Sequence, residues 1–180
     1  SLWLAYHDDM ADPKSGDPVA RESTRLWCAA GSGAQTTLDP RQLQKWFSNP
    51  GYGGHAFGKY EYGKDFEKFL ADREKLFPWI AEYSPFALVS AGDPPVYLSY
   101  GNKPPAQGLG PDSIHGVTFG IGLQKRCAEL GVECHVVFPD APDAKYKSPI
   151  EYLAATLKAS VAAQADHSRG KEKHKIPSSR

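Results

Sequence analysis

The segment that most constrains the fold is a strand, a loop, a helix and a second strand in succession between residues 93 and 139. Residues 93–101 place two prolines, which cannot donate to a sheet ladder, before large apolar and aromatic side chains that suit a buried strand. Residues 117–130 carry apolar side chains at helical spacing, which predicts a helix ending at Gly131. Residues 132–139 predict another strand. This succession is a βαβ unit, which predicts a parallel sheet.

The two predicted strands also indicate where a functional site should lie. In open parallel sheets, ligands bind beyond the carboxyl ends of the strands. The loops at those ends are residues 101–115 and 139–148. Catalytic or binding residues are therefore expected in these two loops.

The rest of the chain supplies further elements of an α/β domain. We expect one domain over residues 1–165 and a disordered tail over residues 166–180, where the composition is polar and basic. The first helix has no cap before it, so we expect the N-terminal part of the same domain to precede Ser1. The other predicted helices are at 1–11, at 40–47 with Asp39 as its cap, at 64–83 with a kink at Pro78, and from 148 on. A third strand is predicted at 24–30, ended by the turn 31–33. Residues 48–63 are predicted to form an irregular segment.

Composition excludes several classes of function. The chain has 21 basic and 21 acidic residues, so a nucleic-acid-binding face is not expected. No apolar run approaches the roughly 18 residues of a membrane span. We expect no cofactor, because no glycine-rich phosphate loop follows a strand. We expect no metal either, because the acidic residues beside His7 are explained by a solvated helix end.

The three cysteines do not form a disulfide framework or a CxxC metal pattern. Cys127 and Cys134 lie on a consecutive helix and strand, so a bridge between them is open. Buried free thiols are the interpretation that we favour. The cysteines therefore do not identify the redox compartment.

In this order of elements, the chain resembles the C-terminal half of an α/β-hydrolase of the esterase/lipase group. The resemblance covers residues 1–160 and is carried by Ser84-Pro85, Asp93-Pro94-Pro95-Val96, Gly101 and Leu130-Gly131-Val132-Glu133. It implies a partial α/β-hydrolase fold and a serine hydrolase of carboxylesterase or lipase type. The implied substrate is a small-molecule ester, with acyl groups on carbohydrate as one class. Such enzymes need a serine on a strained turn, an acid after a later strand and a histidine after the last strand.

The nucleophile is missing from the sequence pattern. No complete G-x-S-x-G occurs. The nearest match surrounds Ser90, but it lacks the first glycine and precedes a strand instead of a helix. Ser32 lies between two glycines and is explained as a turn residue. The resemblance therefore places the nucleophile upstream of Ser1.

For the acid and the base, the resemblance points to Asp112 and His115. Asp112 follows the central strand, although it could equally cap the next helix, and Asp39 is a weaker alternative acid. The loop 140–147, which should hold the catalytic histidine, has none. His115 is the substitute, and its alternative interpretation is an exposed residue at a helix start. His135 is expected to be packed within its strand, and His55 could approach the site from the irregular segment.

Two functions therefore remain open. The first is an esterase, with the aromatic residues of segment 48–63 lining a sugar-ester pocket or simply packing on one another. The second is a catalytically degenerate hydrolase-like domain that binds a ligand, which the absent loop histidine favours. The sequence predicts neither the compartment nor the oligomeric state.

Overall fold

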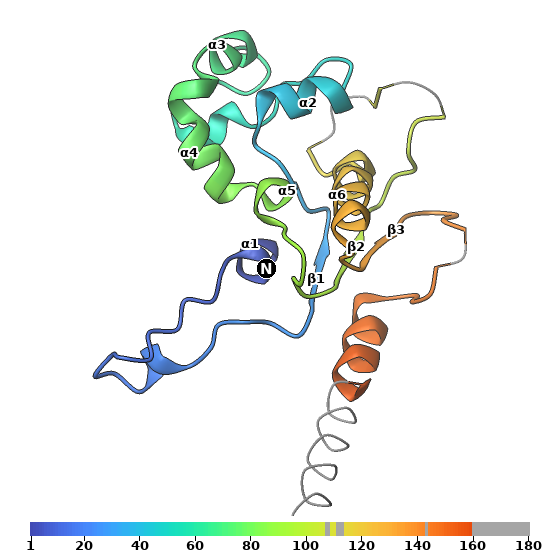
Figure 1. The fold of residues 1–180 in the computed structure, drawn as a ribbon. Coiled ribbons are helices and arrows are strands. Elements are labelled where there is room, and N and C mark those ends of the chain that lie inside the picture. Colours follow the sequence, from blue (N-terminus) through green and yellow to red (C-terminus); the bar gives the residue numbers. More distant parts are fainter. Residues whose placement is uncertain (107–108, 111–113, 143, 160–180) are drawn as a thin grey trace, which may run out of the picture.

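A three-stranded parallel sheet forms the centre of the protein (Figure 1). The computed structural model describes residues 1–106, 109–110, 114–142 and 144–159. The strands are β1 (Ala29–Ser32), β2 (Val96–Ser99) and β3 (Cys134–Val137), in the order β1-β2-β3. In the register, Val96 pairs with Ala29 and with Cys134. The predicted α/β class and the parallel pairing of the βαβ unit are confirmed.

The two faces of the sheet pack against different helices because side chains alternate along each strand. Val96 and Leu98 belong to the main core, together with residues of α1 (Leu2–Tyr6), α5 (Pro85–Leu88) and α6 (Val117–Leu130). Tyr97 points the other way and stacks on Tyr152, with ring centroids 5.5 Å apart. Tyr152 belongs to a helical segment at 149–159. The sheet is therefore covered on one face by α6 and on the other by this last helix.

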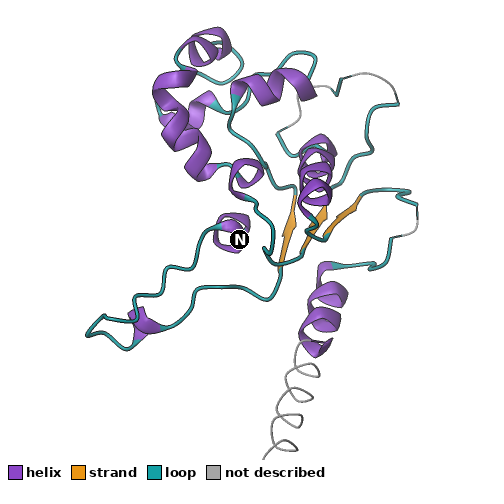
Figure 2. Ribbon diagram, viewed as in Figure 1, coloured by secondary structure: helices purple, strands orange, loops and turns teal. Residues whose placement is uncertain are grey.

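Three further helices lie beyond the carboxyl end of β1 (Figure 2). They are α2 (Pro40–Trp46), α3 (Phe66–Ala71) and α4 (Arg73–Tyr83). They enclose two small cores, one around Leu43 and Phe47 and the other around Phe69 and Ile80. This helical layer lies over the end of the sheet where a functional site is expected.

The predicted helix at 64–83 is two helices, α3 and α4, which are separated at Asp72. The Asp72 carboxylate accepts hydrogen bonds from Lys59 (3.0 Å), Tyr60 (2.8 Å) and Lys75 (2.8 Å). These bonds fix Asp72 at the junction, where its φ of −85° and ψ of 0° depart from helical values. Pro78 lies inside α4. The break at Asp72 was not predicted because it depends on these side-chain partners, and the kink expected at Pro78 stays a prediction.

Two other boundaries differ from the predictions for a related reason. The N-terminal helix ends at Tyr6 instead of residue 11, and β1 begins at Ala29 instead of residue 24. Asp9 accepts hydrogen bonds from Ser23 Oγ at 2.6 Å and from Thr24 N at 2.9 Å. Side-chain bonds of this kind compete with helix and sheet ladders for the backbone groups. They join segments 7–12 and 23–25 in an irregular connection.

Several local predictions are confirmed. Asp39 caps α2, because its side chain accepts a bond from Arg41 N at 2.9 Å. Gly131 ends α6 with a φ of +71°, which favours glycine. Ser148 Oγ accepts from Glu151 N at 3.1 Å at the start of the last helix. Segment 48–63 is irregular except for one short 3-10 turn, Gly54–Phe57.

The cysteines are free, and Cys127 and Cys134 are buried. No helix in the described part of the chain combines the length and the apolar character that crossing a membrane requires. The predicted tail at 166–180 lies outside the described residues, so the domain boundary at 165 stays a prediction.

Candidate functional site

The carboxyl ends of β1 and β2 meet at a glycine turn. β1 ends at Ser32, and Gly33 follows with a φ of +58°, a conformation that side chains rarely adopt. Gly33 N donates to Ser99 O at 2.8 Å, which ties the turn to the last residue of β2. The turn is therefore held at the end of the sheet where the βαβ rule places ligands.

His115 packs directly on this turn. Its Nδ1 lies 2.7 Å from the carbonyl oxygen of Gly33. Because a carbonyl only accepts, Nδ1 carries the proton in this contact and Nε2 keeps its lone pair. A Cβ added at Gly33 would lie 3.2 Å from His115 Cβ, so the glycine also makes room for the ring. The side chain is exposed, and Nε2 forms no hydrogen bond within the described residues.

Two neighbouring groups position the turn and the histidine. The Tyr100 hydroxyl donates to Ala34 O at 2.8 Å, and burial raises the pKa of this phenol. The Asn102 side chain accepts from Val117 N at 3.1 Å and so fixes the first residue of α6, two positions after His115. The Gln35 amide nitrogen lies 3.3 Å from His115 Nδ1 and flanks the ring. Gly33 and Gln35 were not predicted as site residues from the sequence. The sequence feature that could have indicated Gly33 is the Gly-Ser-Gly turn directly after a predicted strand.

Neither a carboxylate nor a serine hydroxyl is hydrogen-bonded to His115 in the part of the chain that the structure describes. Asp112, the first candidate for the acid, lies outside the described residues, so its role stays a prediction. Ser32 is exposed and close in sequence to Gly33, but no bond joins it to the imidazole. His115 is thus positioned without a visible nucleophile or acid.

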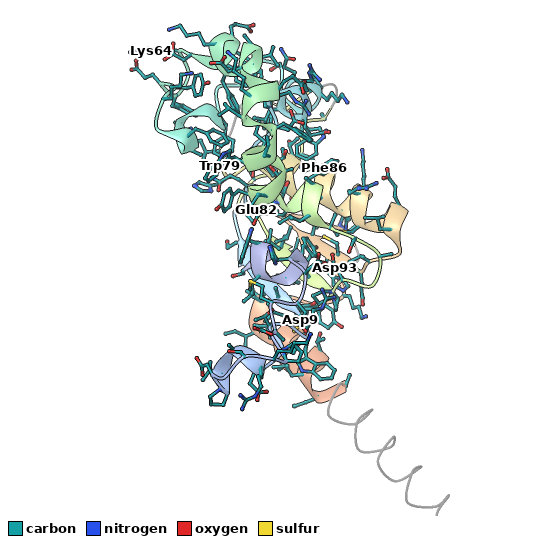
Figure 3. All side chains as sticks on the ribbon, turned by 60° about the vertical axis from the view of Figure 1, so that its left-hand side comes forward. Asp9, Lys64, Trp79, Glu82, Phe86 and Asp93 are labelled. Atoms are coloured by element: carbon teal, nitrogen blue, oxygen red, sulfur yellow. The ribbon has the colours of Figure 1, made fainter. Side chains whose placement is uncertain are left out.

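The alternative candidates lie elsewhere and have other partners. Ser90 precedes β2 and lies at the amino end of the sheet. Its N and Oγ both donate to Asp93 Oδ2, at 2.7 and 3.2 Å (Asp93 is labelled in Figure 3). Asp39 caps α2 and binds Arg73, so its carboxylate is fully engaged. His135 is packed within β3 as expected, with its ring against Tyr146 and Tyr152. None of these residues is hydrogen-bonded to His115.

The aromatic residues of segment 48–63 pack mainly on the protein itself. Tyr52 and Tyr60 are buried, against Phe119 and Phe69 respectively. Burial raises the pKa of Tyr52 to about 12. His55 lies against Tyr52 and does not approach His115 within bonding distance. The structure therefore favours the second interpretation of this segment, aromatic residues packed on one another.

No group of histidine, cysteine, aspartate or glutamate side chains in the described residues is arranged to hold a metal ion. The chemistry available at the turn is that of one exposed imidazole with a fixed proton on Nδ1. Such a group can accept a proton at Nε2.

Comparison with known proteins gives fold similarity only. No family model matches the chain, and no curated protein sequence matches it. The fold is similar to an acetyl ester-xyloside bifunctional hydrolase from Caldicellulosiruptor lactoaceticus, with a TM-score of 0.49 and 19% identity over 76% of this chain and 40% of that chain. It is also similar to a truncated carbohydrate esterase from gut microbiota, with a TM-score of 0.46 and 11% identity over 77% of this chain and 46% of that chain. The chain spans less than half the length of both structures.

Proposed function

We propose that this chain forms part of a serine-hydrolase-type esterase in which His115 is the general base. The observation that supports this most directly is the contact of His115 Nδ1 with the Gly33 carbonyl. It selects the tautomer with a free Nε2 lone pair, which is the form that a serine hydrolase needs. In a standard triad a carboxylate performs this orienting function, and here a backbone carbonyl takes its place.

The proposed reaction follows from this geometry. His115 Nε2 takes the proton of a serine hydroxyl while the serine oxygen attacks the ester carbonyl carbon. The resulting imidazolium returns the proton to the alcohol oxygen as the ester C–O bond breaks, which leaves an acyl-serine and a free alcohol. A water molecule, deprotonated by the same nitrogen, then hydrolyses the acyl-serine.

The serine in this proposal lies outside the residues described here. No described serine hydroxyl is bonded to His115, and Asp112 remains the proposed acid. A carbonyl orients the ring but does not offset the positive charge of the imidazolium as a carboxylate does. The acid is therefore expected to stabilise the charged intermediate rather than to select the tautomer. Small-molecule esters are the proposed substrates, with acyl groups on carbohydrate as the narrower class that the sequence resemblance suggests.

The second candidate function is a hydrolase-like domain that binds a ligand without turnover. The observation that favours it is the absence of any described serine or carboxylate bonded to His115. In that case the imidazole acts as a hydrogen-bonding group at the carboxyl edge of the sheet. The two functions differ in whether the protein turns over an ester.

The kinetic test uses the intact gene product, with residues 1–180 and any sequence that the gene encodes around them. Hydrolysis of p-nitrophenyl acetate should show a burst, and His115→Ala should lower kcat by about 10³-fold or more. His55→Ala is the matched control, because His55 is also exposed but packs on Tyr52. A His115→Ala variant that keeps kcat within threefold of the parent would exclude His115 as the base.

A spectroscopic test separates a positioned base from a surface histidine. ¹⁵N spectra of the imidazoles at neutral pH should show the proton of His115 on Nδ1. Gly33→Ala, which crowds His115 Cβ at 3.2 Å, should reduce that tautomer and the turnover together. A binding domain would show the same tautomer without a burst, and this outcome would select the second function.

A further inference from the structure

A cavity lies between α2 and α6, separate from the contact of His115 with Gly33. It has a volume of about 290 Å³. One wall comes from the end of α2, one from the outer side of α6 and one from Pro104, Pro105, Leu109 and Gly110. The lining residues that matter here are Lys45, Trp46, Pro104, Pro105, Thr118 and Lys125. This region was not identified from the sequence, because its walls lie far apart along the chain.

The polar side chains around this cavity offer donors and no carboxylate. Lys45 and Lys125 form no ion pair within the described part of the chain, although Lys59, Lys68 and Lys75 each contact an aspartate. The Thr118 hydroxyl and the Trp46 indole N–H have no hydrogen-bond partner among the described residues. No described residue that lines the cavity is acidic. Four donor groups that have no partner among the described residues, two of them cationic, thus belong to residues that line one cavity.

Two of these donors, the Trp46 indole and the Thr118 hydroxyl, belong to side chains that pack closely on glycines of the cavity wall, whereas Lys45 and Lys125 are exposed at its rim. A Cβ added at Gly122 would lie 2.2 Å from Trp46 Cζ2, which shows that the indole ring rests on the backbone of α6. The same ring makes edge contacts with Phe86 at 5.3 Å and with Phe119 at 6.1 Å. On the other side, a Cβ at Gly110 would lie 2.8 Å from Thr118 Oγ1. Close packing of this kind fixes side-chain directions.

We propose that this cavity binds a small organic carboxylate that carries a flat apolar ring. A carboxylate only accepts hydrogen bonds, and it would satisfy ammonium, hydroxyl and indole donors together. The ring would contact the two prolines and the indole, as apolar walls with a few placed polar groups are typical of small-molecule sites. The proposal does not depend on the esterase function, because none of its residues takes part in the proposed proton transfer.

The binding test uses benzoate as the probe and the same intact gene product as the kinetic test. Benzoate titrated into ¹⁵N-labelled protein should shift the Trp46 indole N–H resonance in a saturable manner. Benzamide, which has the same ring without the charge, should bind at least tenfold more weakly. Raising the salt concentration should weaken benzoate binding, because exposed charges are screened.

Matched variants locate the site. Lys45→Met and Lys125→Met keep most of the side-chain stem, and each should weaken benzoate binding by about fivefold or more. Lys14→Met is the control, since Lys14 is equally exposed and unpaired but lies far from the cavity in the segment before β1. All three variants change exposed side chains, and circular dichroism spectra would confirm the fold. The proposal is overturned if benzoate does not saturate, if benzamide binds as well, or if Lys14→Met has the same effect as the other two.

Discussion

The ion pair between Asp39 and Arg73 should be the strongest single electrostatic contribution to the stability of the helical layer. Arg73 Nε lies 2.7 Å from Asp39 Oδ1, and Nη2 lies 2.6 Å from Oδ2, so the contact is bidentate. Side-chain exposure is 12% for Arg73 and 20% for Asp39. The pair joins α4 to the N-cap of α2, and both helices lie beyond the carboxyl end of β1.

The expected cost of Arg73→Met follows from this partial burial. Exposed pairs contribute up to about 1 kcal/mol, and removal of one partner from a fully buried pair costs about 3–5 kcal/mol. The Asp39–Arg73 pair lies between these limits, so we expect a loss of about 2 kcal/mol in the free energy of unfolding. For a domain of this size, that loss corresponds to about 4–8 °C in Tm. Urea unfolding followed by tryptophan fluorescence would measure it.

The pH dependence gives an independent check. Burial alone would raise the pKa of Asp39, but the bonds from Arg73 and the N–H of Arg41 outweigh it and hold that pKa below its usual value. A carboxyl whose pKa is lowered by folding stabilises the protein above its unfolded pKa of about 4. The stabilisation is then lost as the pH falls through the lower, folded pKa. The cost of Arg73→Met should therefore be full at pH 6 and smaller at pH 2.5.

A double-mutant cycle with Asp39→Asn isolates the pair, because asparagine is also a good N-cap. Arg41→Met is the matched control. Arg41 contacts Glu74 at 2.8 Å, but these side chains are 58% and 66% exposed, so its loss should cost less than about 0.5 kcal/mol. Equal costs for Arg73→Met and Arg41→Met, or a cost that does not change with pH, would refute the reasoning.

Two further predictions concern other parts of the chain. Gly122→Ala should lower the free energy of unfolding, measured by urea titration, by about 1–2 kcal/mol. The reason is that the new Cβ would lie 2.2 Å from the Trp46 ring, and this clash outweighs the gain in helix propensity. Gly16→Ala is the control and should have no comparable effect, because no atom lies within 4 Å of a Cβ at Gly16. The Asp9 carboxyl should titrate near pH 2, because the Ser23 hydroxyl and backbone N–H groups hold its pKa at about 2. Ser23→Ala should move the Asp9 pKa toward the usual value of about 4 in a ¹³C carboxyl titration, and an unchanged value would contradict this cause.

Local sequence determined the elements whose signals lie within a few residues. The prolines and apolar run before Gly101, the helical spacing of 117–130 and Gly131 together predicted the βαβ unit, and the sheet has that topology. Asp39 and Pro40 likewise predicted the start of α2. These features depend on backbone propensities, capping and the spacing of apolar residues, so a single sequence contains them.

Tertiary structure decided the features that depend on partners distant in sequence. The bonds from Asp9 to Ser23 and Thr24 ended the first helix early and delayed β1, and the bonds of Asp72 with Lys59 and Tyr60 divided the predicted long helix. At the candidate site, the sequence analysis predicted His115 but not its contact with the Gly33 carbonyl, 82 residues away. The cavity beside Trp46 exists only because α2 and α6 pack together. Backbone propensity acts over a few neighbouring residues, whereas hydrogen-bond partners and cavity walls are set by which segments the folded chain brings side by side.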